Sequence, residues 1–470
     1  MILKRILCFL ICTVLLVSLF SVTACATEDT MQQASVSQGS HTLDASKSLL
    51  GDGRLVSNTQ AALLYEVNTQ TLLYGYNADE RMHPSSFVKL MTLLIAIEEG
   101  NLEEIITIKQ EVLDTVPGDA MVVGLKAGET MNLQDLLYCM MVGSGNDAAA
   151  IIADAVCGSQ SAFVDRMNAY AQQLGCNNTN FTNVHGLHHN DQYTTARDAA
   201  KIIEQGLRHD LFRLIIGTSV YTVSANDVSA ERRLVTNNYL ISTNVMEIYY
   251  DYRVTGGRTG KANDGTRCIA AVAEAGNMEL ISIVMGCRSV YENDGYTERV
   301  YGGFPETTKL LDNGFNGFRG VQLFHQDQVM RQFSVMGGNA NLFLGASTDA
   351  YTVLPSGVSL EDLTFVYQDT FSGAYPSVPI RKGQALSSVQ VWYGDVCIGS
   401  AELHAMNGVT EDVDMFVPST HPQAKTPWWA WLLIIAGVLA AAFVLFVLAL
   451  RYIPAFRRVV FGGHRRYRRR

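Results

Sequence analysis

The stretch His83-Pro84-Ser85-Ser86-Phe87-Val88-Lys89 begins an apolar helix that we expect over residues 87–98. Ser86 and Lys89 lie three residues apart, so their side chains share one face of this helix. Such a pair is a nucleophile with its own base, provided that burial lowers the pKa of the lysine. The helix N-terminus adds backbone N–H groups that can bind a developing oxyanion. The stretch alone is weak support for a serine acylation site, because a chain with ten lysines contains about one such spacing by chance.

Predicted strands stand before and after a helical middle. Residues 61–67 and 71–76 form a hairpin around a polar turn, and strands return at 268–273 and 280–285. Apolar residues at three- and four-residue spacing predict helices at 87–98, 133–141, 147–156, 161–174, 195–205 and 305–313. We therefore expect an α+β fold in which helices cover one antiparallel sheet built from both ends of the domain.

Two further fragments carry polar side chains at positions suited to chemistry. Gly143-Ser144-Gly145-Asn146-Asp147-Ala148-Ala149 places a serine and an amide on a loop just before a helix, although Ser-x-Asn also occurs at Ser224 and Ser242. Val254-Thr255-Gly256-Gly257-Arg258-Thr259-Gly260-Lys261 is a glycine-rich run heading into strand residues, where small side chains let a ligand approach the backbone. A solvated edge strand or a turn explains the second fragment equally well.

Together, and in this order, the three fragments resemble the active site of the serine D,D-peptidases that penicillin inhibits, whose signature is Ser-x-x-Lys, Ser-x-Asn and Lys-Thr-Gly. The resemblance narrows to the D-alanyl-D-alanine carboxypeptidases, the low-molecular-mass penicillin-binding proteins, and covers roughly residues 56–318. It implies a β-lactamase/D,D-peptidase-like fold followed by a β domain and a membrane anchor. Further similar stretches are Leu125-Lys126-Ala127-Gly128-Glu129, Asn183-Val184-His185-Gly186-Leu187, Thr195-Ala196-Arg197-Asp198 and Lys309-Leu310-Leu311-Asp312-Asn313-Gly314-Phe315.

The resemblance also implies a serine acyl transfer. Ser86 would attack the peptide carbonyl between two D-alanines, with Lys89 as general base, and water would later release the acyl group. Ser144 would relay a proton toward the departing amine. Asn146 would hydrogen-bond both Lys89 and an amide of the substrate. The implied substrate is a peptidoglycan stem peptide ending in D-Ala-D-Ala, and β-lactam antibiotics would be inhibitors.

The strand fragment would bind the substrate. By resemblance, Arg258 and Thr259 would hold the terminal carboxylate, with Gly260 beside them, and the backbone N–H groups of Ser86 and Lys261 would form the oxyanion hole. Arg258 stands where the family usually has lysine. Arginine keeps the positive charge and can bind a carboxylate in a bidentate way, but it stays protonated and cannot shuttle a proton. This departure leaves open a catalytically weakened penicillin-binding or wall-binding protein of the same fold.

Other functions have less support in the sequence. A class A β-lactamase shares the serine–lysine helix, but the chain contains no Glu-x-x-Leu-Asn run to place a deacylating water. Neither a Cys-x-x-Cys pair nor a His-Glu-x-x-His helix occurs, so we expect no metal and no cofactor. His185 and Asp198 lie in family-like stretches, and structural hydrogen bonds explain both. After the expected signal, six cysteines remain without paired spacing, which favours small buried thiols over a disulfide framework.

Both ends of the chain carry long apolar runs. Lys4 and Arg5 precede an uncharged run and then Ala24-Cys25-Ala26, a pattern that predicts an export signal over 1–26. The same site also resembles the lipobox of bacterial lipoproteins, in which Cys25 would carry lipid. Residues 428–450 contain no charge and are long enough to cross a bilayer. The tail 451–470 holds eight arginines and no acid, so the positive-inside rule keeps it cytoplasmic.

The part between these ends is acidic and extracytoplasmic on this interpretation. The chain has 35 Lys and Arg against 45 Asp and Glu, and ten of the cations lie in the signal and the tail, which argues against nucleic acid as a partner.

The sequence also indicates how this part divides. A stretch rich in Ser, Thr and Gly suggests a linker near its start, and short β-rich runs such as 364–367 and 389–393 suggest a second domain. The expected boundaries are 27–50 linker, 51–318 catalytic domain, 319–416 β-rich domain and 417–427 linker.

Overall fold

The computed structural model describes residues 48–50, 53–243, 246–291, 298–371, 375–411 and 428–452. The predicted signal peptide, the linker at 417–427 and the tail beyond residue 452 lie outside the described residues. Contacts divide the chain into two compact units, which are described separately. The first comprises residues 1–332, 342–374 and 381–407, and the second comprises 333–341, 375–380 and 408–470.

An antiparallel five-stranded sheet organises the first unit. Its order is β2-β1-β9-β8-β7, so strands from the beginning of the domain lie beside strands from its end. The expected hairpin and the two later strands are confirmed. The bounds are β1 Ala61–Glu66, β2 Thr71–Tyr76, β7 Val254–Lys261, β8 Arg267–Ala275 and β9 Met278–Cys287. Strand β7, which carries the glycine-rich fragment, forms one edge of the sheet.

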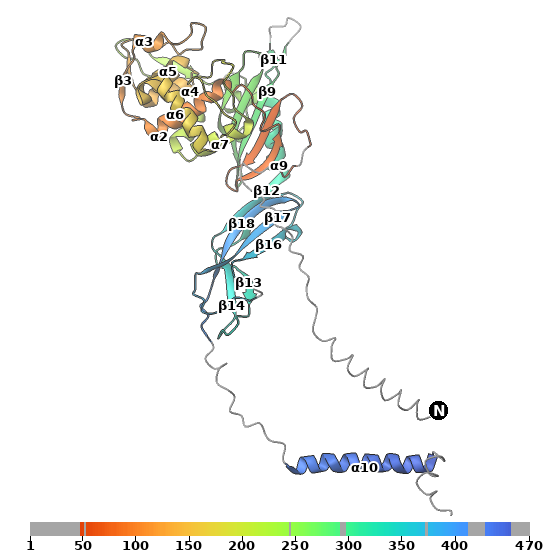
Figure 1. The fold of residues 1–470 in the computed structure, drawn as a ribbon. Helices are drawn as coiled ribbons and strands as arrows, with labels where there is room; N and C mark the ends of the chain where they lie inside the picture. The colour runs from red at the N-terminus through yellow and green to blue at the C-terminus, as the bar shows by residue number, and fades with distance from the viewer. Residues whose placement is uncertain are drawn as a thin grey trace, which may run out of the picture. The chain divides into compact units, whose positions relative to one another are not determined.

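Helices cover both faces of this sheet. Alternate residues of β1 point to opposite faces: Leu63 and Tyr65 join one hydrophobic core, and Ala62 and Leu64 join the other. Figure 1 shows α2 and α4 to α7 gathered on one side, while Leu310 of α9 belongs to the second core. The predicted α+β class is confirmed. The bounds are α2 Val88–Glu99, α4 Leu133–Met141, α5 Asn146–Cys157, α6 Gln160–Gln173, α7 Ala196–Gly206 and α9 Phe304–Gly317.

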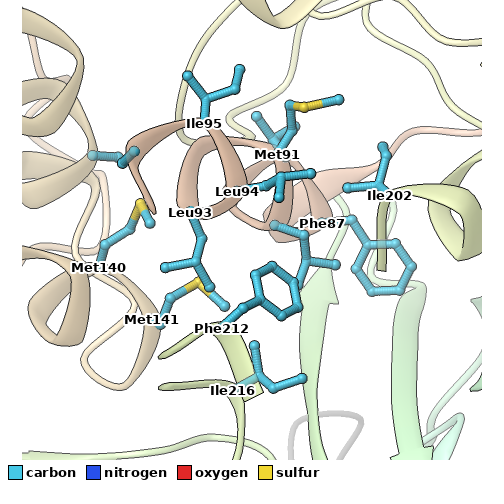
Figure 2. Packing of buried hydrophobic residues seen from close by; sticks show 14 of the residues in the cluster. Phe87, Met91, Leu93, Leu94, Ile95, Met140, Met141, Ile202, Phe212 and Ile216 are labelled. Carbon is cyan, nitrogen blue, oxygen red and sulfur yellow. The ribbon is translucent and has the colours of Figure 1, made fainter. Parts of the chain in front are cut away.

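Helix α2 is enclosed over most of its length. Each residue from Val88 to Ala96 is buried, so the helix has no polar face in its first nine residues. Figure 2 shows Met140 and Met141 approaching α2 from one side, with Phe87 and Ile202 on the other. The single charged residue within this buried run is Lys89, which is 1% exposed. Packing around α2 therefore dictates the environment of the predicted base.

Several short elements were not predicted from the sequence. They include two hairpins, β3–β4 and β5–β6, and the short helices α3 and α8. Strand β3 alternates exposed and half-buried residues, so it lacks a clear apolar pattern. The bounds are β3 Ile105–Thr107, α3 Gln110–Leu113, β4 Thr130–Asn132, α8 Asp210–Ile216, β5 Val220–Val223, β6 Arg232–Val235, β10 Val290–Tyr291, β11 Glu298–Val300 and the 3-10 turns η1 Ser85–Phe87, η2 Tyr239–Ile241 and η3 Glu247–Tyr249.

Strands dominate after α9, as the sequence predicted. Strand β12 pairs with β15, and β14, β18, β17 and β16 pair in that order. The predicted strands at 364–367 and 389–393 lie within β16 and β17. The bounds are β12 Phe318–Phe324, β13 Val329–Phe333, β14 Leu342–Ala346, β15 Ala350–Pro355, η4 Leu360–Asp362, β16 Thr364–Asp369, β17 Ala385–Tyr393 and β18 Val396–Ala405. The domain boundaries drawn from the sequence remain predictions.

The second unit contains helix α10, Trp428–Tyr452. Its segment Ile435–Tyr452 is long and apolar enough to cross a membrane, so the helix is a candidate anchor. The cysteines of the described residues all lie in the first unit. None of these six forms a disulfide; Cys157 is half-buried and the other five are buried.

Candidate active site

The three sequence fragments meet at one pocket of about 200 Å³ between the helices and β7. Six of the predicted site residues line it: Ser86, Ser144, Asn146, Thr259, Gly260 and Lys261. The two remaining predicted residues, Lys89 and Arg258, are 1% and 2% exposed and lie beneath that lining. The fold therefore brings together side chains that are up to 175 positions apart in the chain.

Ser86 lies in the 3-10 turn η1, which leads directly into α2. The preceding residue, Ser85, adopts a positive φ of 48°, a conformation that side chains with a Cβ rarely adopt. Its Oγ donates a hydrogen bond to the carbonyl oxygen of Lys261 at 2.8 Å, which fixes the turn to β7. Within the described part of the chain, the Ser86 hydroxyl makes no hydrogen bond and remains available to a ligand.

Lys89 is held by two acceptors. Its Nζ donates to Asn146 Oδ1 at 2.5 Å and to the carbonyl oxygen of His185 at 2.8 Å. Burial lowers the pKa of Lys89 well below its ordinary value, and the positive charge of Arg258 lowers it further, while Asp147 acts in the opposite sense. A neutral amine has two N–H bonds and one lone pair. Both N–H bonds are taken by these acceptors, so the lone pair is left to accept a proton.

Arg258 is tied to the second fragment. Its Nη2 donates to Ser144 Oγ at 2.5 Å, and its Nη1 donates to the carbonyl oxygen of Met141 at 2.6 Å. Burial lowers the pKa of Arg258 to about 10, so the guanidinium remains charged at neutral pH. Because Ser144 Oγ accepts from Arg258, its own O–H is free to donate to another group.

The edge of β7 lies close against η1. A Cβ at Gly260 would come within 3.0 Å of Ser85 Oγ and of the Ser86 backbone nitrogen, so only glycine lets the strand approach this turn without a shift. Thr259 Oγ1 donates to Asn237 Oδ1 at 2.7 Å. As an edge strand, β7 can pair through its backbone with an extended peptide.

Sequence reasoning missed some residues that build this site. The group that His185 contributes is a main-chain carbonyl oxygen, which no residue pattern marks. Asn237 stands in no motif that distinguishes it from the other asparagines of the chain. Burial is the main cause that lowers the pKa of His185 to about 4, so its ring is neutral at neutral pH. His185 and Asn237 both line the pocket.

A loop closes the pocket on the side of α5. The carboxylate of Asp147 accepts hydrogen bonds from the backbone nitrogens of Val123, Gly124 and Leu125 at 3.0–3.2 Å. The backbone nitrogen of Asn146 donates to the carbonyl oxygen of Met121 at 2.8 Å. Asn146 is therefore fixed by the loop as well as by its helix. Over the described ranges, no group of three His, Cys, Asp or Glu side chains is arranged to hold a metal ion.

Comparisons with known proteins point to one family. A sequence profile described as D-alanyl-D-alanine carboxypeptidase matches residues 54–289. The D-alanyl-D-alanine carboxypeptidase DacC of Escherichia coli (strain K12) is 30% identical over 366 residues, covering 75% of this chain and 85% of its own. DacF of Bacillus subtilis (strain 168) is 27% identical over 338 residues, covering 71% of this chain and 82% of its own.

A solved structure supports the same assignment. Penicillin binding protein 5 from Haemophilus influenzae aligns with a TM-score of 0.61 and 27% identity, covering 77% of this chain and 100% of that one. The profile spans all three fragments of the pocket, from the turn that carries Ser86 to the strand that carries Lys261. The chain belongs to the D-alanyl-D-alanine carboxypeptidase family.

Proposed function

We propose that this protein is a serine-type D-Ala-D-Ala carboxypeptidase that removes the terminal D-alanine of peptidoglycan stem peptides through an acyl-enzyme on Ser86. The observation that carries the proposal is the state of Lys89. Its amine is buried, its pKa is lowered, and two acceptors occupy its N–H bonds. A buried lysine with a lowered pKa, three residues from a serine on one helix face, is suited to act as the general base for that serine.

In the first half-reaction, Lys89 accepts the hydroxyl proton of Ser86 while Ser86 Oγ attacks the carbonyl carbon between the two D-alanines. The negative charge that develops on the carbonyl oxygen is bound by the backbone N–H groups of Ser86 and Lys261. The C–N bond then breaks as Ser144 donates its proton to the departing amine and takes up the proton held by Lys89, which returns Lys89 to its neutral form. Ser144 is suited to this transfer because Arg258 occupies its oxygen and leaves its O–H to donate.

In the second half-reaction, water attacks the acyl-enzyme ester and releases the shortened peptide. Lys89 again accepts the proton and returns it to Ser86 Oγ as the ester bond breaks. Asn146 orients Lys89 throughout, since it accepts from Nζ at 2.5 Å. A β-lactam would acylate Ser86 in the same way, and we propose penicillins as inhibitors.

The ends of the chain suggest where the reaction takes place. We propose that residues 1–26 direct export, that α10 anchors the protein in the bacterial membrane, and that the arginine-rich tail stays in the cytoplasm. The catalytic domain would then face the cell wall. This placement agrees with a substrate that lies outside the membrane.

The test is intact-mass spectrometry of the purified protein after incubation with penicillin G, beside Ser86→Ala. We expect one covalent adduct per chain, lost in Ser86→Ala without loss of the fold. Release of D-alanine from a peptide ending in D-Ala-D-Ala completes the test. Adduct formation without turnover would favour the weakened penicillin-binding protein that Arg258 leaves open, and an adduct on Ser86→Ala would refute the assignment of the nucleophile.

A further inference from the structure

Two histidine rings contact each other in the lining of the pocket. The rings of His83 and His188 lie 4.2 Å apart between their centroids, with an angle of 47° between their planes. They come from different segments of the chain, because His83 precedes the turn η1 and His188 belongs to the loop 183–190. The contact therefore joins two distant segments, although the proposed mechanism gives neither ring a step.

One of these segments carries the nucleophile, and the other holds the base. His83 precedes Ser86 by three residues, and His188 follows His185 by three. The carbonyl oxygen of His185 accepts the hydrogen bond from Lys89 Nζ at 2.8 Å. A shift of one segment against the other would therefore change how Ser86 and Lys89 face each other.

The loop that carries His188 is attached at both its buried and its exposed end. At the buried end, Thr92 Oγ1 of α2 donates to the carbonyl oxygen of Val184 at 2.7 Å. The last residues of the loop are exposed, and the ring of His188 contacts the half-buried His83 from there. The ring contact therefore fixes the end of the loop that its own burial does not.

The charge of the rings decides whether their contact is favourable. Neutral imidazoles attract each other as other aromatic rings do, whereas two protonated rings at this separation repel. Burial is the main cause that lowers the pKa of His83, a positive charge on His188 lowers it further, and Asp264 acts in the opposite sense. The His83 ring is therefore neutral at neutral pH, and the contact weakens as the pH falls below about 6.5, the ordinary value for histidine.

The groups around the pair can balance one added proton. Asp264 faces His83 from the turn between β7 and β8. The other titratable groups nearby are Asp119, Lys261 and Arg267 in the pocket lining, the neutral His185, the buried thiol of Cys268, and His189 beside Asp191 on the loop. Since one carboxylate faces His83, repulsion begins when both rings carry a proton.

We propose that His83 and His188 are positioning residues for acylation at Ser86, and that their contact makes the site sensitive to acid. While the rings are neutral, they hold the loop against the serine turn, and the carbonyl oxygen of His185 orients the amine of Lys89. When both rings are protonated, the loop moves away and Lys89 loses this acceptor. The inference rests on the proposed carboxypeptidase function and adds a pH-dependent control of its site.

The experiment measures the second-order rate constant of acylation by penicillin G on the full chain in detergent, at about pH 8 and about pH 5. His188→Phe keeps an aromatic ring and removes the charge. We expect it to react within about twofold of the wild type at the higher pH and about tenfold faster than the wild type at the lower pH, where the wild-type rings repel. Protonation of Lys89 slows both proteins alike, so it cancels in this ratio.

His188→Ala removes the contact at both pH values. We expect its rate to fall about tenfold below that of the wild type at the higher pH and to approach the wild-type rate at the lower pH. Circular dichroism checks that this variant is folded. His189→Ala is the matched control, because His189 is an exposed neighbour outside the pocket lining, and we expect it to follow the wild type at both pH values.

Two results would overturn the assignment. One is a folded His188→Ala protein that acylates like the wild type at the higher pH. The other is a wild-type rate at the lower pH that equals or exceeds that of His188→Phe; an excess would show that protonated rings attract the anionic antibiotic instead. If the wild type forms no adduct at either pH, the carboxypeptidase proposal fails before the histidine pair is considered.

Discussion

At the residue scale, Arg258 contributes to the low proton affinity of the proposed base. Its positive charge lowers the pKa of Lys89, in addition to the larger effect of burial. Acylation needs the neutral amine, so its rate falls as the pH drops below this pKa. In Arg258→Gln the charge is gone, the pKa of Lys89 rises, and the acidic limb of the rate profile moves to higher pH. The measurement is the second-order rate constant of penicillin acylation between pH 5 and about 10.

Arg258→Lys separates charge from geometry. Lysine keeps the positive charge, so the acidic limb stays in place, and we expect turnover that is preserved or raised. A fall in turnover of more than about tenfold, or 1.4 kcal/mol, would instead show that the site has adapted to the two-pronged contact with Ser144 and Met141. An unchanged limb in Arg258→Gln would show that the limb does not report Lys89.

Gly186 fixes the serine turn by its lack of a side chain. Its φ is +89°, and a Cβ there would lie 2.0 Å from the carbonyl oxygen of Ser85. Gly186→Ala therefore has to displace the turn that presents Ser86, and we expect acylation to fall by about a hundredfold or more. Penicillin adduct formation over time measures this loss.

Gly158→Ala is the control for this change. Gly158 has a similar φ of +75°, but a Cβ there would meet no atom within 4 Å. We expect it to lose about 1–2 kcal/mol of folding free energy from the left-handed backbone and to acylate normally. Equal acylation by both variants would show that the contact with Ser85 does not matter.

The residues proposed for the chemistry could be named from motifs in the sequence, whereas the residues that hold them in place could not. Two short motifs contain Ser86, Lys89, Ser144 and Asn146, and the fold brings these motifs together at one pocket. The acceptor from His185 is a main-chain atom, and the role of Asn237 depends on the turn η2, which lies far from Thr259 in the chain. Long-range packing decides such contacts, and a local pattern does not record it.

At the scale of elements, a buried ion pair links the loop beside the pocket to the hairpin β5–β6. Glu129 is fully buried and accepts hydrogen bonds from Arg232, Asn226 and Ser229. Arg232 Nη2 also donates to the carbonyl oxygen of Gly124 at 2.9 Å. Since Gly124 belongs to the backbone that binds Asp147, this pair supports the loop that positions Asn146.

Arg232→Ala leaves the buried carboxylate without its partner. We expect this variant to lose about 3–5 kcal/mol of folding free energy, which is the usual cost of breaking a buried pair from one side. Thermal unfolding of the full chain in detergent measures the loss. Arg233→Ala, the exposed neighbour on the same strand, is expected to change stability by less than about 0.5 kcal/mol. Similar losses in both would mean that the pair contributes nothing specific.

The same pair predicts a pH dependence of stability. Burial raises the pKa of Glu129, but hydrogen bonds from Arg232, Asn226, the Lys126 backbone and Ser229 outweigh it and bring the pKa to about 2, from an ordinary 4.5. Because the folded pKa is the lower one, the stabilisation is present above about pH 4.5 and is lost as the pH falls toward 2. In Glu129→Gln this part of the acid-induced loss disappears, and unfolding curves at several acidic pH values show it.

The elements that sequence reasoning found are those with long periodic patterns. Helix α4 begins and ends where the spacing of apolar residues predicted, and α2, α5, α6 and α7 differ by one residue at either end. Hairpins β3–β4 and β5–β6 were not predicted, because their strands have only three and four residues and are partly exposed. Such strands bury too few side chains to show an alternation of apolar and polar residues. Their place in the fold comes from contacts such as Glu129 with Arg232.

At the scale of the whole molecule, α10 is expected to decide where the protein resides. A chain truncated after Glu411 lacks this helix, and we expect it to move from the membrane fraction to the soluble fraction. Its rate of acylation is expected to stay within about twofold of the full chain, because each residue of the pocket precedes Glu411. Fractionation followed by labelling with a fluorescent penicillin measures both. A truncated chain that stays in the membrane would indicate a second anchor, such as lipid on Cys25.

The thiols described above make this protein convenient to produce and to label. Because the six cysteines of the described residues form no disulfide, the catalytic domain needs no oxidising compartment to fold and can be expressed in the cytosol of a reducing host. Burial raises the pKa of Cys139, Cys268 and Cys287, so these thiols react slowly with maleimides. In a Cys157→Ser background, which removes the half-buried thiol, a cysteine introduced at Asp119 on the rim of the pocket would be the main site that a fluorophore reaches, and its emission would report ligand entry in real time.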